Sequence, residues 1–545
     1  MTTNKYTLVI LALATFLACN DPDDIVAPEI IEELPELTAG TADFSTYVAV
    51  GASFTAGFTD NALFKAAQEN SFPYILSQQF EKIGGGTFVQ PLTNDNYGGL
   101  AAGGSRLPGF DPRLVFGGAG PVPLESVIGP VTVGTDIALN KPTGPFNNMG
   151  IPGAKSFHLL FNGYGNIANL ATATANPYFV RMASNSSATI LGDAMAQNPT
   201  FFTLSEIGAS DVLGYALTGG DGPNPITPSA GVPGVGFDQT FGYIVTTLTS
   251  AGAKGVVTNV PYITDLPHFT TVPHNPLSPL NPSFGPQIPT LNGIFGQLNQ
   301  VFAFLGVPER SIVFSTTEAS SVIIKDESLA NLSTQITGVL NASATFPAFV
   351  QSFGLPAEAA PTVATLFGLV YGQARQATAD DLLVLPSSSV IGTLNQTSLQ
   401  TLINYGLPAQ LAGQFSAEGI TLPLEDKWVL TPEEQTEIKT AIDAYNSTIA
   451  SVANSNNNVA LLDLNGILSN ASLNGVVFDE YILETSLVTG GAVSLDGIHL
   501  TARGYAFLAN KFLEVIDAAF GSNFIASGNV AKAGDYPTNY SPTLQ

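Results

Sequence analysis

Short apolar runs, separated by longer stretches of mixed polarity, recur along this chain. Runs of this kind are typical of β-strands that are buried on both faces of a sheet. We expect five such strands, at 47–50 (YVAV), 86–92 (GTFVQPL), 199–208 (PTFFTLSEIG), 254–261 (KGVVTNVP) and 458–464 (NVALLDL).

Between these runs, apolar positions recur with the spacing of amphipathic helices. The helix at 431–453 has the clearest start, because Thr431 and Glu434 form the pattern of a capping box and Pro432 stands at its first position. Ser71 is expected to cap the first helix. The predicted helices lie at 71–84, from Asp211 onward, and at 238–253, 431–453 and 501–520.

Apolar strands that alternate with helices predict a parallel sheet with helices on both faces, which is a doubly wound α/β domain of about five strands. In such sheets a functional site lies at the carboxyl ends of the strands. Long loops rich in proline, at 218–236 and 262–286, belong to that edge. We expect them to form the walls of a cleft.

Composition divides the chain into an N-terminal leader and one large domain. Residues 310–425 fit no simple strand–helix unit, so we interpret them as an insertion and, in one interpretation, as a helical cap. The stretch 84–153 is rich in Gly, Pro and Asn and is expected to be mostly loop. The segments are a signal peptide at 1–18, an acidic Pro-rich tether at 19–43, the α/β domain at 44–520 and a tail at 521–545.

The amino-acid composition and net charge also limit the kinds of molecule that this protein can bind. With 545 residues, of which 45% are hydrophobic and 11% charged, the chain can bury a sizeable core. Its formal net charge of -26 at pH 7 would repel nucleic acid phosphates and anionic lipid surfaces. We therefore expect no nucleic acid partner.

The N-terminus has a secretory pattern, in which Lys5 precedes an apolar run that is too short to span a bilayer. Cys19, the sole cysteine, follows this run, so no disulfide can form within one chain. The stretch FLAC resembles a bacterial lipobox, which implies lipidation of Cys19; a buried thiol near an ordinary signal is the alternative. The acidic NDPDD that follows is similar to export tags of Gram-negative surface lipoproteins, or it is a solvated linker.

The turn after the first predicted strand carries Ser53. Gly51 and Gly57 flank this turn and permit a tight backbone that presents the hydroxyl at the carboxyl edge of the sheet. A serine at such a place can be a nucleophile, although it can also simply cap a helix.

Asp496 and His499 stand three residues apart, just before the last predicted helix. A serine hydroxyl becomes a good nucleophile when an imidazole takes its proton and a carboxylate orients that imidazole. Asp496 and His499 can form this pair, and a local ion pair or helix cap is the alternative. The other histidines, His158, His268 and His274, share no metal-binding spacing, so we expect neither a metal nor a cofactor.

Four blocks of this sequence, in order, resemble those of the SGNH or GDSL-type hydrolases: VAVGASFTAG at 48–57, NMGIPGAKS at 148–156, GASD at 208–211 and DGIHLTARGY at 496–505. The resemblance implies a flavodoxin-like three-layer α/β/α fold and ester hydrolysis through an acyl-enzyme. It implies that Ser53 is the nucleophile, His499 the general base and then acid, and Asp496 its orienting carboxylate. It further implies an oxyanion hole formed by the amides of Ser53 and Gly153 and the side chain of Ser210.

Two positions depart from the family pattern. Ala52 stands where the family often has Asp, outside the triad, and Ser210 stands where the family has Asn. Loss of one oxyanion donor typically lowers turnover by about 100 to 1000 fold, although a serine hydroxyl can still donate, directly or through water. If Ser210 does not serve, Asn147 and Asn148 are the expected alternative donors.

These patterns predict an exported, lipid-anchored serine esterase or lipase-like hydrolase at the outer membrane or cell surface of a Gram-negative bacterium. Its expected substrates are neutral acyl or acetyl esters of a glycan or lipid. The alternative is a surface protein that keeps the fold, has weakened turnover and binds glycan or lipid. The complete set of Ser53, Asp496 and His499 favours the enzyme, whereas Ser210 favours the alternative.

Overall fold

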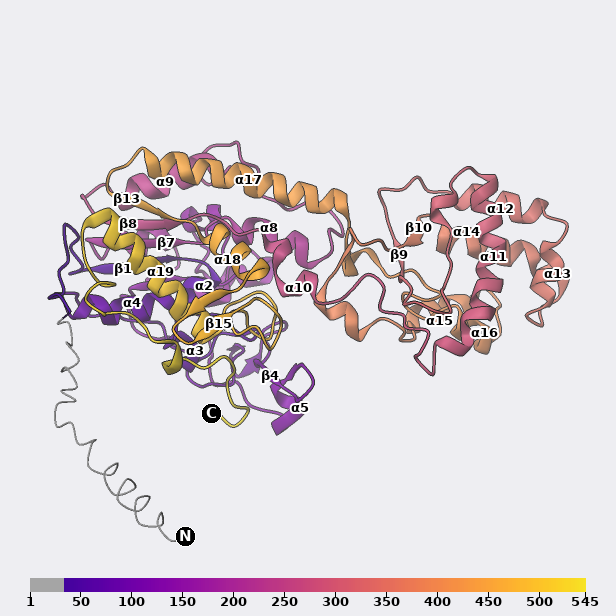
Figure 1. Ribbon diagram of the computed structural model, residues 1–545, viewed down its shortest axis with the longest axis horizontal. Coiled ribbons are helices and arrows are strands. Elements are labelled where there is room, and N and C mark those ends of the chain that lie inside the picture. Colours follow the sequence, from indigo (N-terminus) through magenta and orange to yellow (C-terminus); the bar gives the residue numbers. More distant parts are fainter. Residues whose placement is uncertain (1–33) are drawn as a thin grey trace, which may run out of the picture. The chain divides into compact units, whose positions relative to one another are not determined.

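The computed structural model describes residues 34–545, and Leu37–Gln545 form one compact unit. The predicted signal peptide, Cys19 and most of the predicted tether lie outside the described residues. The unit contains a five-stranded parallel sheet in the order β13-β8-β7-β1-β6 (Figure 1). These strands are β1 (Tyr47–Gly51), β6 (Asn148–Gly150), β7 (Phe201–Ser205), β8 (Lys254–Thr258) and β13 (Val459–Leu462).

The order of the sheet reverses at β1. β1 lies between β6 and β7, the second and third strands of this sheet along the chain, which is the flavodoxin-like arrangement. Ligands of such sheets bind at the carboxyl edge where the order reverses. In this protein that place lies between the ends of β1 and β7, where Gly51 pairs with Ser205. The three-layer α/β prediction is confirmed.

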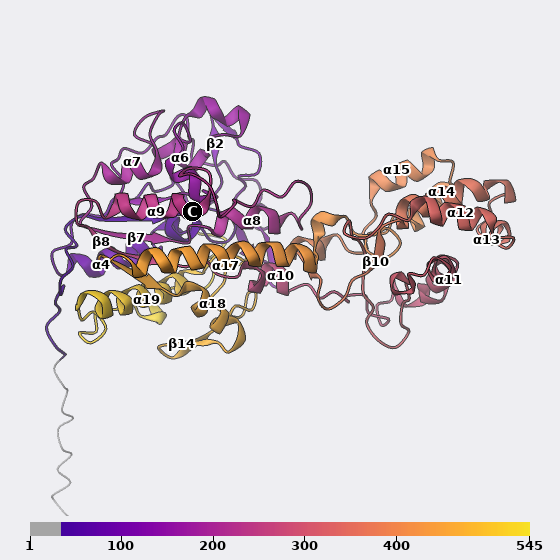
Figure 2. The ribbon, with the colours of Figure 1, turned by 90° about the horizontal axis from the view of Figure 1, so that it is seen from above.

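Alternate residues of the central strands enter different hydrophobic clusters. Val48 and Val50 of β1 pack in the cluster that contains α7, α9 and α17. Tyr47 and Ala49 pack in the cluster that contains α4, α18 and α19, so both faces of the sheet are covered (Figures 1 and 2). The bounds are α4 (Phe72–Glu81), α7 (Ile190–Met195), α9 (Phe237–Leu248), α17 (Pro432–Asn454), α18 (Leu464–Leu473) and α19 (Ala502–Phe520).

The starts of these helices test the capping predictions. In α17 the predicted box is formed, and both the amide and the hydroxyl of Thr431 donate to Glu434 Oε2 at 2.7 Å. In α19 the hydroxyl of Thr501 accepts a first-turn amide at 2.9 Å. Ser71 occupies the N-cap position of α4, but its side chain makes no cap hydrogen bond, and its hydroxyl donates to Gln90 Oε1 at 3.3 Å.

The strand predicted at 86–92 is wrong, because the second strand of the sheet along the chain is β6, inside the stretch expected to be mostly loop. The amide of Val89 donates to the side-chain oxygen of Asn147 at 2.9 Å. Pro91 has no N–H, and its carbonyl accepts from the side chain of Gln68 at 2.9 Å. The Val89 carbonyl also accepts the amide of Asn147 at 2.9 Å, so this segment makes a few mixed contacts rather than a continuous ladder.

Residues 272–429, which we call the inserted lobe, fold around a hydrophobic cluster of their own. The cluster begins at Val272, well before the predicted start of the insertion. Helices α11, α12 and α14 contribute to it (Figure 1). Arg375 forms ion pairs with Asp326 and Asp381, both at 2.6 Å.

The bounds of the remaining α-helices and strands, and of two 3-10 helices named below, η7 and η8, are as follows. Outside the inserted lobe they are α2 (Ser53–Ala56), α3 (Lys65–Gln68), β2 (Ala101–Ala102), β3 (Ser105–Arg106), β4 (Leu114–Phe116), β5 (Pro121–Pro123), α5 (Leu124–Ile128), α6 (Pro177–Met182), α8 (Ala209–Leu217), α10 (Pro267–Thr270), β14 (Val476–Phe478) and β15 (Tyr481–Leu483). Within the lobe they are α11 (Ile288–Phe304), β9 (Ile323–Lys325), α12 (Ser333–Ala342), α13 (Phe346–Gln351), α14 (Ala360–Tyr371), β10 (Ala374–Gln376), β11 (Leu382–Leu383), η7 (Leu385–Ser389), α15 (Gln396–Asn404), α16 (Ala409–Gln414) and η8 (Asp426–Trp428), with β12 (Val429–Leu430) at its end.

We call the part of Leu37–Gln545 outside the inserted lobe the α/β unit. The C-terminal residues pack against it. Tyr540 is buried against Phe64, with ring centroids 4.9 Å apart, and Arg113 Nη2 donates to the carbonyl of Ser541 at 2.6 Å.

Among residues 34–545, no helix combines the length and the apolar character that a membrane crossing requires.

Candidate active site

Ser53 is the first residue of α2, directly after β1. The turn is tight at Gly51, where a Cβ atom would lie 2.0 Å from Thr55 Oγ1, so no other residue fits without rearrangement. Gly57 ends the short helix with a φ of 78°, in the left-handed region. Ser53 is therefore held, half-buried, at the carboxyl edge of the sheet.

A buried carboxyl group, Glu206, supports this turn from the end of β7. Its Oε1 accepts the amides of Ala52 at 2.8 Å and Thr55 at 3.1 Å, and its Oε2 accepts the Thr55 hydroxyl at 3.2 Å. Burial raises the pKa of Glu206 to about 7, although these hydrogen bonds oppose the rise. Glu206 was not predicted from the sequence, where the only signal is an acidic residue that directly follows a buried strand.

Asp496 and His499 form the predicted pair, with His499 Nδ1 2.8 Å from Asp496 Oδ2. Both side chains are buried. The His499 ring lies 4.6 Å from the ring of Phe58 and 5.9 Å from that of Phe54, measured between centroids. The helix that follows is capped by Thr501, so the pair is not needed as the cap that the alternative interpretation proposed.

Asp496 is surrounded by donors. Its Oδ1 accepts the amides of Ile498 and His499 at 2.8 and 2.9 Å and the hydroxyl of Ser494 at 3.1 Å, and its Oδ2 also accepts the amide of Asn61 at 2.9 Å. Burial alone would raise the pKa of Asp496. The charge and hydrogen bonds of His499, together with the backbone amides, outweigh burial and hold the pKa far below its usual range. Asp496 is thus a fixed anion beside the imidazole.

A second buried carboxyl group, Asp60, joins the loop after α2 to the loop that carries Asp496. Asp60 Oδ1 accepts the amide of Leu495 at 3.1 Å, and the amide of Asp60 donates to Ser494 Oγ at 3.1 Å. Burial raises the pKa of Asp60 to about 7, and the charge of Asp496 adds to the rise. Asp60 was also missed, because 436 residues of sequence separate it from its acidic neighbour in space.

All five predicted site residues line one cavity of about 570 Å³: Ser53, Gly153, Ser210, Asp496 and His499. In the described part of the chain, no hydrogen bond joins the Ser53 hydroxyl to His499. Catalytic hydrogen bonds are often loose without substrate and tighten when it binds, so this arrangement is compatible with a triad.

Two residues that line the cavity have a backbone amide without an acceptor in the described part of the chain. Neither the Ser53 nor the Gly153 N–H has a hydrogen-bond acceptor among residues 34–545. Gly153 is exposed, with a φ of 77° that few other residues adopt. Amides held in this way can stabilise an oxyanion without reorganisation.

Ser210 lies in the first turn of α8. The next residue, Asp211, accepts the hydroxyl and the amide of Ser156 at 2.7 and 2.8 Å, which fixes α8 against the segment that carries Gly153. The alternative donors are excluded. Asn147 Nδ2 donates to a strand carbonyl at 2.9 Å, and Asn148 Nδ2 donates to the Thr55 carbonyl at 2.9 Å.

His268 is a second imidazole in the cavity, where the sequence did not predict it. Its Nδ1 lies 3.3 Å from the backbone oxygen of Asp496, so Nδ1 is the protonated nitrogen of this contact. Its Nε2 is buried and has no hydrogen-bond partner in the described residues. Burial lowers the pKa of His268, which favours the neutral ring beside the cavity.

The rest of the cavity wall is largely apolar. Phe58, Leu213 and Leu217 come from the α/β unit, and Leu385 and Pro386 come from η7 of the inserted lobe. These two residues are therefore the part of the inserted lobe that reaches the cavity, where the sequence suggested a cap. Such a wall suits an acyl chain or another neutral group.

Neither His158 nor the group of acidic side chains that could hold a metal ion lines this cavity. His158 Nδ1 accepts the amide of Lys155 at 3.0 Å and its ring stacks on Tyr164, and burial lowers its pKa to about 4. In the described residues, the one group of three side chains that could hold a metal ion lies elsewhere and shares no residue with this cavity.

No family model, no curated protein and no solved structure matches this chain. The site therefore rests on its own geometry.

Proposed function

We propose that this chain is a serine ester hydrolase of the SGNH or GDSL type that cleaves neutral acyl or acetyl esters. The observation that carries the proposal is that Ser53, the Asp496–His499 pair and two unoccupied amides line one cavity. The net charge of -26 disfavours anionic substrates, and the apolar wall favours neutral ones.

The proposed reaction follows from the donors and acceptors available. Ser53 Oγ attacks the ester carbonyl carbon while His499 takes its proton, and the amides of Ser53 and Gly153 stabilise the negative oxygen. The carbon–oxygen bond to the alcohol then breaks, and His499 returns the proton to the leaving alkoxide. Water repeats the sequence on the acyl-enzyme and releases the acid, with Asp496 holding the imidazole throughout.

Labelling with a fluorophosphonate probe tests the proposal. Wild type should be labelled, and both Ser53→Ala and His499→Ala should lose almost all labelling, because the probe reacts with an activated serine. Ser388→Ala is the matched control, since Ser388 is an exposed serine of η7 near the same cavity. Labelling that persists in Ser53→Ala would place the nucleophile elsewhere.

A second candidate function, a surface protein that binds glycan or lipid with little turnover, is supported by Ser210 in place of Asn and by the missing Ser53–His499 hydrogen bond. Turnover of a short p-nitrophenyl ester separates the two candidates. Ligand binding with no hydrolysis above that of Ser53→Ala would favour the binding protein.

We also propose that the protein is exported and lipid-anchored through Cys19, at the outer membrane or cell surface of a Gram-negative bacterium. Support comes from the sole cysteine at the end of an apolar run. Cys19→Ala should release the protein from the membrane fraction of expressing cells, whereas Phe16→Leu, which keeps the cysteine, should not. Unchanged fractionation of Cys19→Ala would contradict the anchor.

A further inference from the structure

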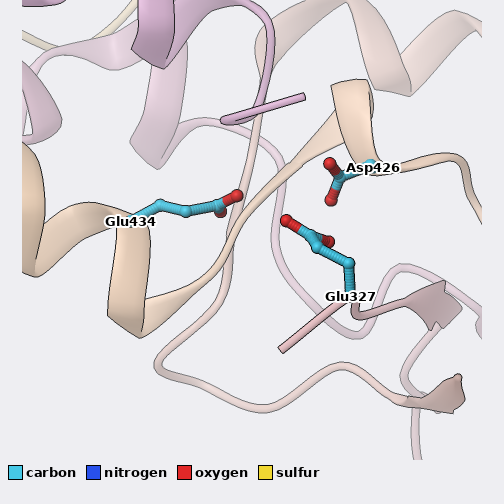
Figure 3. Close-up of side chains that lie close together, drawn as sticks. All are labelled: Glu327, Asp426 and Glu434. Carbon is cyan, nitrogen blue, oxygen red and sulfur yellow. The ribbon is translucent and has the colours of Figure 1, made fainter. Parts of the chain in front are cut away.

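Three carboxyl groups meet where the inserted lobe joins α17. Glu327 follows β9, Asp426 begins η8, and Glu434 lies in the first turn of α17. One oxygen from each lies within 4.8 Å of those of the other two. Figure 3 shows the three side chains pointing toward one another from three different segments. We call them the acidic cluster.

Two oxygens of the acidic cluster are buried and have no partner. Asp426 and Glu434 are each 5% exposed, and neither Asp426 Oδ1 nor Glu434 Oε1 has a hydrogen-bond partner among residues 34–545. Glu434 uses only its other oxygen, Oε2, for the Thr431 capping box. A buried carboxyl oxygen without a partner is costly, and a bound cation would offset this cost at both atoms.

Among residues 34–545, no positive side chain pairs with the acidic cluster. No ion pair includes any of its members, and the nearby Lys427 pairs with Glu425 instead. Buried carboxylates are normally paired or bound to a metal, so a bound cation would supply the positive charge that the described side chains do not.

The shape of the cluster suits an ion. Gly220, with a φ of 83°, packs directly on it, and a Cβ at this position would lie 2.0 Å from Glu434 Oε1. Glu327 is exposed, so the acidic cluster lies at the edge of the protein surface. Backbone therefore lines the buried oxygens on one side, and the exposed member of the cluster lies on another.

We propose that the acidic cluster of Glu327, Asp426 and Glu434 is a binding site for a hard divalent cation, and specifically for Ca²⁺. The ligand set consists entirely of carboxylate oxygens, which disfavours Zn²⁺ because that ion prefers nitrogen and sulfur. Three segments of different kinds supply the ligands, and Ca²⁺ tolerates such irregular geometry better than Mg²⁺ does.

Binding at this place would tie the inserted lobe to the α/β unit. Glu327 and Asp426 belong to the lobe, whereas Glu434 starts α17, which packs on the sheet. Gly220 belongs to the loop after α8, the helix that carries Ser210. The cation therefore stabilises the junction of the lobe whose residues Leu385 and Pro386 line the catalytic cavity.

The chain provides its own reporter for the test. Trp428, the only tryptophan, lies two residues after Asp426 in η8, so its excitation should sensitise luminescence of Tb³⁺ bound at the cluster. Wild type, Asp426→Asn and Glu327→Gln would be titrated with Tb³⁺ and then with Ca²⁺ or Mg²⁺ as competitors. Glu318→Gln is the matched control, an exposed carboxylate of the same lobe.

In wild type we expect one Tb³⁺ per chain, displaced by Ca²⁺ at lower concentrations than by Mg²⁺, and a melting temperature that rises with added Ca²⁺ and falls with chelator. Asp426→Asn and Glu327→Gln should weaken Ca²⁺ binding at least about tenfold, because each removes a charged ligand, whereas Glu318→Gln should not. A wild-type melting temperature that ignores Ca²⁺ and chelator would overturn the proposal, even if the variants fail to fold. Equal binding by Asp426→Asn and wild type would show that the ions bind elsewhere on the acidic surface, and tighter binding of Mg²⁺ would overturn the assignment to calcium.

Discussion

Asp496 and the acidic cluster are buried carboxylate sites with opposite environments. Asp496 receives three backbone amides, the Ser494 hydroxyl and the imidazole of His499, and its pKa is held far below the usual range. Asp426 and Glu434 each keep an oxygen without a partner, and their pKa values are raised. At Asp496 the surrounding donors and the imidazole favour the anion, whereas Asp426 and Glu434 lack such partners among residues 34–545.

Glu206 has donors but no imidazole partner. It accepts two amides and a hydroxyl, yet burial still raises its pKa to about 7, and among residues 34–545 no imidazole or cation pairs with it. The His499 ring therefore distinguishes Asp496 from Glu206. We infer that the carboxylate–imidazole pair is the electrostatic centre of the site and that Glu206 is a support for the turn of Ser53.

The largest expected effect comes from removing the anion at Asp496. Asp496→Asn keeps the size of the side chain but cannot hold His499 in the tautomer that accepts the Ser53 proton, so kcat on a short acyl ester should fall by about 10⁴-fold. Asp380→Asn, an exposed carboxylate of the inserted lobe, serves as the control and should retain wild-type kcat. If Asp496→Asn keeps more than a tenth of the turnover, Asp496 is a structural residue rather than part of a triad.

The sequence predicted most of the α/β framework because its strands are continuous apolar runs. β1, β7, β8 and β13 lie where these runs predict them, and so do α9, α17 and α19. The second strand was misplaced, because β6 is only three residues long and begins with the polar Asn148. The run at 86–92 is more apolar, but Pro91 lacks an N–H and the run makes only scattered hydrogen bonds, some of them to side chains, instead of a ladder.

Local sequence motifs predicted the candidate catalytic residues, but not the buried residues that pack around them, such as Glu206 and His268. Asp496 and His499 are neighbours in sequence, so their pairing could be predicted from spacing alone. Glu206 and His268 reach the site from the ends of other elements, and their roles depend on burial that only the folded chain creates. The acidic cluster was beyond prediction for the same reason, since its members come from three separate segments.

Glu206 offers a second way to test how burial and charge compete. Its pKa is about 7 in the folded protein, against an ordinary value of 4.5 in an unfolded chain, so the folded protein keeps a proton that the unfolded chain releases. The stabilisation from Glu206 is therefore complete below pH 4.5 and is lost as pH rises through 7, a change of about 3 kcal/mol.

Glu206→Gln mimics the protonated side chain at every pH. Relative to wild type, its free energy of unfolding should improve by about 3 kcal/mol between pH 4 and pH 8, measured by urea denaturation at both values. Asp60, whose pKa is also raised, is present in both proteins and cancels in this difference. A difference that does not change with pH would mean that the pKa of Glu206 is the same in the folded and unfolded protein, so that its hydrogen bonds offset the effect of burial.

The smallest expected effect comes from changing the side chain at position 210, the proposed third hydrogen-bond donor to the carbonyl oxygen of the ester. That oxygen becomes negative only during the reaction. Ser210→Asn would place a longer amide donor at the cavity, where the hydroxyl of Ser210 can already supply part of the interaction. We expect kcat to rise by at most about 100 fold with little change in KM, because an oxyanion contact strengthens only as charge develops on the carbonyl oxygen. Steady-state kinetics of both proteins on one ester measure the two parameters. The side chains of Asn147 and Asn148 donate to backbone carbonyls and cannot replace this donor. Unchanged or lower turnover in a folded Ser210→Asn protein would therefore mean that no third donor acts. The amides of Ser53 and Gly153 would then stabilise the oxyanion by themselves.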